Sequence, residues 1–334
     1  MGAGGWSSLS ATSRDALAAH AVDKISRVPG TYREFTDTAA QAARIQRISV
    51  SLLESLLDLG LPHRGSGAER RFDHLDLENA SLTMRLPGPR WTAMRWWPRA
   101  LRECPLSGEA SYRLTVKTYC PAPPGPHRCE WDIHSHALSA AAPGSVLKTG
   151  DGYTVCLTVT CVDHIFGPPF TALIEALLPV EHHLIPDALA GDIGFMTATG
   201  LADCRLASAF LVQAGRELGA WVRPAKGLLL ATPFPGWHSW VEFRTAGGWL
   251  AADPLLLSNF ARWGLVDAAE WPAARSPHSF FCRWHPSMPP LVTHDGEPVR
   301  PVLELSREQH PPAQRERRPA GGVPPEAGRH RVSH

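Results

Sequence analysis

Residues 200–254 read GLADCRLASAFLVQAGRELGAWVRPAKGLLLATPFPGWHSWVEFRTAGGWLAADP. The segment carries, in chain order, a cysteine (Cys204), a histidine (His238) and an aspartate (Asp253). These three residue types can act as a nucleophile, a base and a group that orients the base. The segment is therefore the strongest candidate for a reactive centre, provided that its local structure lets the three side chains meet.

The first part of the segment predicts a helix from Asp203 to Leu218. Apolar residues recur there at helical spacing, and the charged residues fall largely on the opposite side. Asp203 is a suitable N-cap, and Gly219 is a suitable stop just past the last apolar residue. Cys204 would then lie in the first turn, where the positive end of the helix dipole favours a thiolate.

The second part of the segment predicts a β-hairpin. Trp237–Arg244 alternates between two faces, and Trp249–Asp253 reads as the returning strand after a glycine-containing turn. In this register Asp253 lies opposite Trp240, and opposed residues share a face of the sheet. His238 and Asp253 therefore point the same way, one diagonal step apart and within reach of a hydrogen bond. A bulge that shifted the register by one residue would separate them.

The order of a cysteine helix, a histidine strand and an aspartate hairpin resembles the transglutaminase-like superfamily of papain-like cysteine enzymes. Three phrases carry the resemblance: Ala-Asp-Cys-Arg around Cys204, His-Ser-Trp-Val-Glu from His238 where the family has His-Ala-Trp-Val-Glu, and Trp249 to Asp253 followed by proline. The phrase Leu-Gly-Ala-Trp after the helix departs from the family's Gly-Ile-Pro-Ala-Arg. That departure concerns packing rather than chemistry.

The resemblance implies an α+β fold in which a helix-borne cysteine packs on an antiparallel sheet, preceded here by a β-rich region. It also implies that Cys204 attacks an amide or thioester carbonyl, that His238 takes and returns the proton, and that Asp253 holds the imidazole. The expected partners are an acyl donor (a peptide, an amide or a thioester) and an amine or water acceptor, with no cofactor. The outcome would be amide formation, transamidation or amide hydrolysis. The usually shorter leader-peptide proteases of lasso-peptide systems share two of the phrases, which suggests peptide or natural-product tailoring.

Each of the three residues also has a purely structural interpretation. Cys204 could be a small buried residue, His238 a half-buried strand residue, and Asp253 a turn former before proline. A transglutaminase-like domain that binds or acts as a scaffold without turnover is therefore the alternative function. Loss of the triad geometry would favour it.

Tryptophan is concentrated around the candidate centre. Seven of the 12 tryptophans lie between residues 221 and 284. Trp237, Trp240 and Trp249 flank the proposed base and orienting acid, so we expect them to form the walls of a substrate-binding cleft and to exclude water. Core packing is the alternative.

Composition limits the partners of the protein. The formal net charge is +1 and charged residues make up 19% of the chain, so there is no electrostatic case for nucleic acid or an anionic membrane. The first thirty residues contain several charges and no long apolar run, and no apolar run elsewhere reaches the length of a membrane span. We therefore expect a cytoplasmic protein. The oligomeric state does not follow from the sequence.

The seven cysteines do not suggest a disulfide framework, because their number is odd and the chain is long. Cys156, Cys161 and His164 match no standard zinc spacing, and His134 and His136 favour a surface position. The sequence therefore predicts no metal site.

The remainder of the chain is expected to divide into parts of different character. A helical N-terminal segment would contain one long helix from Thr36 to Leu59, and the β-rich region would contain runs such as Ser81–Leu86 and Gly152–Val162. The tail has few apolar residues and is predicted to be disordered. The predicted parts are a helical segment (1–65), a β-rich region (66–165), a transglutaminase-like domain (166–300) and a disordered tail (301–334).

Overall fold

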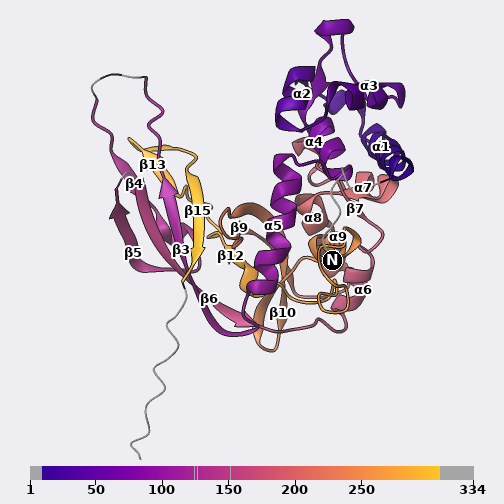
Figure 1. The fold of residues 1–334 in the computed structure, drawn as a ribbon. Coiled ribbons are helices and arrows are strands. Elements are labelled where there is room, and N and C mark those ends of the chain that lie inside the picture. Colours follow the sequence, from indigo (N-terminus) through magenta and orange to yellow (C-terminus); the bar gives the residue numbers. More distant parts are fainter. Residues whose placement is uncertain (1–9, 124, 126, 151, 309–334) are drawn as a thin grey trace, which may run out of the picture.

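The computed structural model describes residues 10–123, 125, 127–150 and 152–308 (Figure 1). The chain has a mixed α+β fold whose sheets, apart from one short parallel pair, are antiparallel, which confirms the expected α+β class. Figure 1 shows the N-terminal helices on one side and the β-rich region on the other, with the sheet that carries His238 between them. None of the helices in the described residues combines the length and apolar character that crossing a membrane requires.

The N-terminal part packs helices around an apolar cluster that includes Ile25, Leu56 and Phe72. Several of these helices begin at a side chain that accepts a backbone N–H, and such caps stabilise a helix by about 1 kcal/mol each. The elements are α1 (Ala11–Ser26), β1 (Phe35–Asp37), α2 (Ala39–Ile45), α3 (Val50–Asp58), β2 (Phe72–Asp73), α4 (His74–Thr83) and α5 (Pro89–Glu103).

The single helix expected from Thr36 to Leu59 is wrong, because the structure has two helices there, α2 and α3. Arg47 lies between them with a φ of 61°, a left-handed conformation that a right-handed helix cannot include. Ile48 and Leu56 are both fully buried. The apolar spacing therefore continues across the break and does not reveal it.

The strand expected at Ser81–Leu86 is also wrong, because the first half of that run ends α4 and the second half is a turn that follows it. This helix buries polar side chains such as Asp76 and Asn79 together with apolar ones, so it shows no amphipathic stripe. The next helix, α5, contains Pro98 in its interior, a residue that normally indicates a break. The β-rich region consequently begins only at Ser107.

The β-rich region contains two antiparallel sheets, with strand orders β15-β3-β6-β5 and β14-β13-β4. The strand expected at Gly152–Val162 is confirmed as β6. The strands are β3 (Ser107–Lys117), β4 (Trp131–Ile133), β5 (Ala141–Thr149), β6 (Gly152–Val162), β13 (Val292–His294), β14 (Glu297–Pro298) and β15 (Val302–Arg307).

The disorder predicted for residues 301–334 is wrong at the start of that segment. β15 pairs along β3 from Val302 opposite Lys117 to Arg307 opposite Tyr112, and Leu305 is buried. The rest of the segment, from residue 309, lies outside the described residues. The pairing of β15 with β3 also joins chain from both sides of the predicted boundary at residue 165.

A third sheet, of order β11-β10-β9-β12, carries the candidate centre. Leu206 and Leu211 of α8 pack with Val241 on one face, whereas Trp97 of α5 packs with Trp240 in the cluster on the other. Both faces of β10 are therefore covered by helices. The elements are α6 (Phe170–Glu175), β7 (Glu181–His182), α7 (Ile193–Thr199), β8 (Leu201–Ala202), α8 (Cys204–Glu217), β9 (Val222–Leu229), β10 (Gly236–Thr245), β11 (Gly248–Ala252), α9 (Pro254–Arg262) and β12 (Phe281–Arg283).

The helix and the hairpin of the 200–254 segment form as expected. Asp203 caps α8, and Gly219 follows the helix with a φ of 67°. In the hairpin Val241 pairs with Ala252, so the expected register is confirmed and no bulge interrupts it. Asp253 is the next residue after this ladder.

Candidate catalytic centre

Three elements bring Cys204, His238 and Asp253 together. Cys204 is the first residue of α8, His238 lies on β10, and Asp253 directly follows β11. His238 Nε2 is hydrogen-bonded to Asp253 Oδ2, and Cys204 lies close enough to His238 to raise the pKa of its imidazole. Because Nε2 faces the carboxylate, Nδ1 is the ring nitrogen left to face the sulfur. The structure thus places all three predicted residues in one contact group.

The start of α8 leaves one backbone donor beside the thiol. Asp203 accepts from the N–H groups of Arg205 at 2.9 Å and Leu206 at 3.1 Å, and its carbonyl accepts from Ala207 at 3.0 Å. The N–H of Cys204, the first residue of the helix, has no acceptor within the part of the chain that the structure describes. It is therefore able to donate to an oxygen of a bound ligand.

Arg205 neutralises the carboxylate next to the thiol. Its Nε donates to Asp203 Oδ2 at 2.8 Å, and its Nη2 donates to the carbonyl of Ile185 at 2.7 Å. It also pairs with Asp187. Without this cation, the negative charge of Asp203 would oppose a thiolate on the adjoining residue.

His238 is held between aromatic rings. Its ring stacks on Phe281 with 5.8 Å between centroids and 19° between planes, and it meets the ring of Trp97 nearly edge-on at 6.4 Å. The side chain is only 7% exposed. Rotation of the imidazole and access of water to it are both restricted.

Asp253 orients His238 and also begins a helix. Its Oδ1 accepts from the N–H of Leu256 at 2.9 Å as the N-cap of α9, while Oδ2 faces His238. Pro254 occupies the first helical position, where its fixed φ suits a helix and its missing N–H costs nothing. The carboxylate direction is therefore set by the helix that it caps.

The charges of the group keep His238 protonated. Burial by itself would lower the pKa of His238, but the negative charges of Cys204 and Asp253 and the hydrogen bonds to both raise that pKa to about 10. Since this exceeds the ordinary pKa of 6.5, the stability contributed by the protonated ring is fully present below pH 6.5 and is lost as the pH rises toward 10. An imidazolium at neutral pH stabilises an adjacent thiolate.

A cavity of about 450 Å³ opens beside the three residues. Cys204 and His238 line it together with Trp97, Trp237 and Trp284. Its size and mainly apolar lining suit a small organic ligand or a peptide side chain. The other lining residues are Leu75, Arg90, Met94, His182, Leu184, Ile185, Asp187, Asp203, Arg205, Lys226, Gly227, Ser239, Leu256 and Met288.

Of the three tryptophans predicted to bind substrate, Trp237 lines the cavity and the other two do not. Trp237 is 57% exposed, and its ring centroid lies 4.7 Å from that of Trp284. Trp240 is 1% exposed and belongs to the core, as the packing alternative predicted. Trp249 lies on a different hollow, where the guanidinium carbon of Arg223 is 4.3 Å from its ring centroid.

The sequence does not place Trp97 or Trp284 in the centre. Trp97 comes from α5, which the sequence did not predict as a helix, and Trp284 follows β12. Both lie far from Cys204 in the chain and reach the cavity only through tertiary packing. The high tryptophan content was the one feature of the sequence that pointed to a tryptophan-lined cavity. It does not indicate which tryptophans come together there.

His182 is a further lining residue with an unusual environment. Burial, followed by the positive charges of Arg90, Lys24 and His238, lowers the pKa of His182 to about 3, so its imidazole is neutral. Its Nδ1 is buried and has no hydrogen-bond partner among the described residues.

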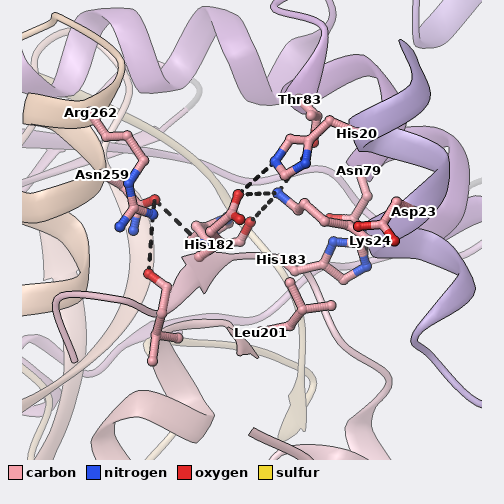
Figure 2. Close-up of polar contacts among 12 residues, drawn as sticks. His20, Asp23, Lys24, Asn79, Thr83, His182, His183, Leu201, Asn259 and Arg262 are labelled. Atoms are coloured by element: carbon pink, nitrogen blue, oxygen red, sulfur yellow. Dashed lines mark hydrogen bonds and ion pairs between the residues drawn. The ribbon is translucent and has the colours of Figure 1, made fainter. Parts of the chain in front are cut away.

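Figure 2 shows the contacts that attach β7, which carries His182, to the N-terminal helices. His20 Nε2 lies 2.8 Å from the carboxylate of Glu181, and Lys24 Nζ lies 3.6 Å from it. Lys24 also donates to the carbonyl of His182 at 3.1 Å, and Asn259 of α9 accepts from the N–H of His182 at 3.3 Å. These contacts fix the backbone at one wall of the cavity.

Gly227 allows β12 to approach β9 directly opposite His238. A Cβ there would lie 2.1 Å from the carbonyl oxygen of Cys282 and 2.9 Å from the nitrogen of Trp284. Gly227→Ala is therefore expected to lower the free energy of unfolding by about 2–3 kcal/mol, measured by urea denaturation. The matched control is Gly191→Ala, where a Cβ would meet nothing within 4 Å, with an expected change within about 0.5 kcal/mol. Equal stability of the two variants would contradict the close approach.

The three residues that the sequence analysis considered as metal ligands do not form a metal-binding group. Among the described residues, the cysteine and histidine group able to hold a metal ion consists of Cys120, His127, Cys129 and His294. Cys156, Cys161 and His164 do not belong to it. The sequence did not predict this group.

A scan against models of known protein families finds none that matches this chain, and a search of curated proteins finds no significant match. An assignment of function therefore depends on the residues and geometry described above.

Proposed function

We propose that the chain is a cysteine-dependent acyl-transfer enzyme with a transglutaminase-like core. Cys204 is the nucleophile, His238 the base and Asp253 the residue that orients the base. The observation that carries the proposal is the position of His238, which is hydrogen-bonded to Asp253 through Nε2 and lines the same cavity as Cys204, close enough for the sulfur to raise the pKa of the imidazole. The packing of α8 on the antiparallel sheet that bears His238 supports the resemblance to the transglutaminase-like superfamily.

The first half-reaction forms a thioester on the enzyme. The thiolate of Cys204 attacks the carbonyl carbon of an amide or thioester donor, and the new C–S bond places negative charge on the carbonyl oxygen. The N–H of Cys204 is positioned to donate to that oxygen. As the bond to the leaving group breaks, protonated His238 gives its proton to the leaving amine or thiolate.

The second half-reaction transfers the acyl group. An amine or a water molecule gives its proton to His238 while its nitrogen or oxygen attacks the thioester carbonyl. Breaking the C–S bond releases the new amide or acid and restores the thiolate beside a protonated His238. An amine acceptor gives amide formation or transamidation, and water gives hydrolysis.

The cavity favours an acyl donor with an apolar or aromatic group near its carbonyl. Trp97, Trp237 and Trp284 line the cavity together with Cys204, and Trp237 is the one of the three whose side chain is largely exposed. A peptide or amide donor that places a large side chain among the three tryptophans fits this lining.

The test is the pH dependence of alkylation by iodoacetamide, with each cysteine followed by peptide mass mapping. At pH 6 we expect Cys204 to react at least about tenfold faster than Cys156, which has similar exposure, because the protonated imidazole favours the thiolate of Cys204. His238→Gln should bring Cys204 down to the rate of Cys156. Cys104 and Cys282 are buried, so their protection in both proteins reports an intact fold.

Two outcomes would contradict the proposal. If Cys204 of the wild type reacts no faster than Cys156 at pH 6, the chain is better described as a binding or scaffold domain. If the fast reaction persists in His238→Gln, a group other than His238 activates the thiol.

A further inference from the structure

A second group of cysteine and histidine side chains lies in the β-rich region. Cys120, His127 and Cys129 occupy the segment between β3 and β4, and His294 is the last residue of β13. Figure 1 places β4 and β13 in the β-rich part, apart from α8 and β10. The group is therefore separate from the candidate catalytic centre.

The four side chains converge on one point. One ligand atom from each, two sulfurs and two imidazole nitrogens, lies within 4.8 Å of all the others. Cys120 Sγ is 3.5 Å from His294 Nε2 and 2.9 Å from His127 Nε2. In a tetrahedral zinc site with Zn–S of about 2.3 Å and Zn–N of about 2.0–2.1 Å, sulfur and nitrogen ligands are about 3.5 Å apart. The first distance already matches, and the second requires only a small outward movement of an exposed side chain.

The two histidines are oriented as metal ligands usually are. Each presents Nε2 to the group and engages Nδ1 elsewhere: His127 Nδ1 lies 2.9 Å from the carbonyl oxygen of Gly125, and His294 Nδ1 lies 3.3 Å from Asp295 Oδ2. A carbonyl or carboxylate acceptor at the second nitrogen fixes the tautomer that leaves Nε2 free to bind a metal. Two independent histidines with this arrangement argue against a chance encounter of polar side chains.

The backbone around the group is supported on one side by the sheet. His294 is buried, pairs with Trp131 of β4, and its ring centroid lies 4.4 Å from that of Trp131. Asp295 accepts from the N–H of Glu130 through its side chain at 2.9 Å and donates its own N–H to the carbonyl of Glu130 at 2.8 Å. The position of His294 is thus fixed, whereas Cys120 and His127 are exposed and depend on the group itself for their positions.

We propose that Cys120, His127, Cys129 and His294 bind one Zn²⁺ ion. Two thiolates and two imidazoles in tetrahedral reach are a ligand set that selects zinc. The protein fills all four coordination positions of the ion, so the site is structural and leaves no position open for a substrate. The ion fastens the segment between β3 and β4 to the hairpin of β13 and β14.

The first test is the metal content of the full-length protein, freed of any affinity tag and measured by mass spectrometry of the elements. We expect about one zinc per chain. X-ray absorption should give two sulfur and two nitrogen neighbours at about 2.3 Å and 2.0–2.1 Å, and Co²⁺ in place of zinc should show the visible absorption of a tetrahedral thiolate complex.

The double variant Cys129→Ser/His294→Gln should retain less than a tenth of the zinc. The matched control Cys156→Ser/His136→Gln changes the same residue types outside the group and should keep it. Because the first variant could unfold, the wild type is also stripped with a chelator and refilled with Zn²⁺, which should restore one ion per chain and raise the melting temperature.

Three results would overturn the proposal. The first is wild-type protein that holds no stoichiometric zinc even after refilling. The second is a double variant that keeps its zinc. The third is a disulfide between Cys120 and Cys129 in protein purified with a reductant, because a disulfide has no thiolate to offer the metal.

Discussion

Cys204→Ala is expected to abolish the covalent acyl-enzyme and to lower the rate of acyl transfer by about 10⁵-fold or more, as loss of a catalytic nucleophile does. Alanine removes the sulfur but keeps Asp203 as the cap of α8, so the helix and the fold should persist. The measurement is intact-protein mass spectrometry after brief exposure to p-nitrophenyl acetate. The wild type should gain one acetyl group at Cys204, and the variant none there.

Cys156→Ala is the matched control, because Cys156 has similar exposure and lies outside the cavity lining. It should acetylate at Cys204 like the wild type. If the Cys204→Ala variant is acetylated to the same extent as the wild type, and the acetyl group maps to another cysteine, the centre is not the reactive site of this protein.

Asp253→Asn is expected to lower the same acylation rate by about 10³–10⁴-fold, the scale seen when the orienting carboxylate of a triad becomes an amide. The amide can still cap α9, so the loss arises from chemistry rather than from the helix. The negative charge of Asp253 is one of the causes that raise the pKa of His238. Its removal should therefore move the upper limb of the pH–rate profile from near pH 10 toward lower pH.

The matched control for Asp253→Asn is Asp192→Asn. Asp192 also caps a helix, accepting from the N–H of Phe195 at 2.9 Å at the start of α7, and it lies outside the cavity lining. It should leave the acylation rate and its pH profile unchanged. If Asp253→Asn matches this control, His238 does not depend on Asp253 for its orientation or its charge.

The parts of the fold that could be predicted are those governed by local signals. The helix from Asp203 had a cap, a periodic apolar face and a glycine stop, and the hairpin had a short turn between alternating strands, so both formed as expected. Because the hairpin register follows from the turn, the contact of His238 with Asp253 followed as well.

The parts that could not be predicted depend on contacts between distant segments. α4 buries Asp76 in contact with Arg33, a partner that no local pattern reveals, and β15 is a strand only because β3 offers it an edge. In the candidate centre, Trp97 and Trp284 arrive from elements on either side of the 200–254 segment. The cysteine and histidine group was missed for the same reason, since His294 lies far from its three partners in the chain.

The pairing of β15 with β3 has a consequence for how this chain can be divided. The chain leaves the β-rich region after β6, forms the sheet and helices of the candidate centre, and returns to add β13 to β4 and β15 to β3. In topological terms, the part that carries the candidate centre is nested inside the β-rich unit rather than appended to it. A fragment ending at residue 165 would expose the free edges of β3 and β4 as templates for self-association. Excising the nested part and rejoining the chain would leave both edges covered.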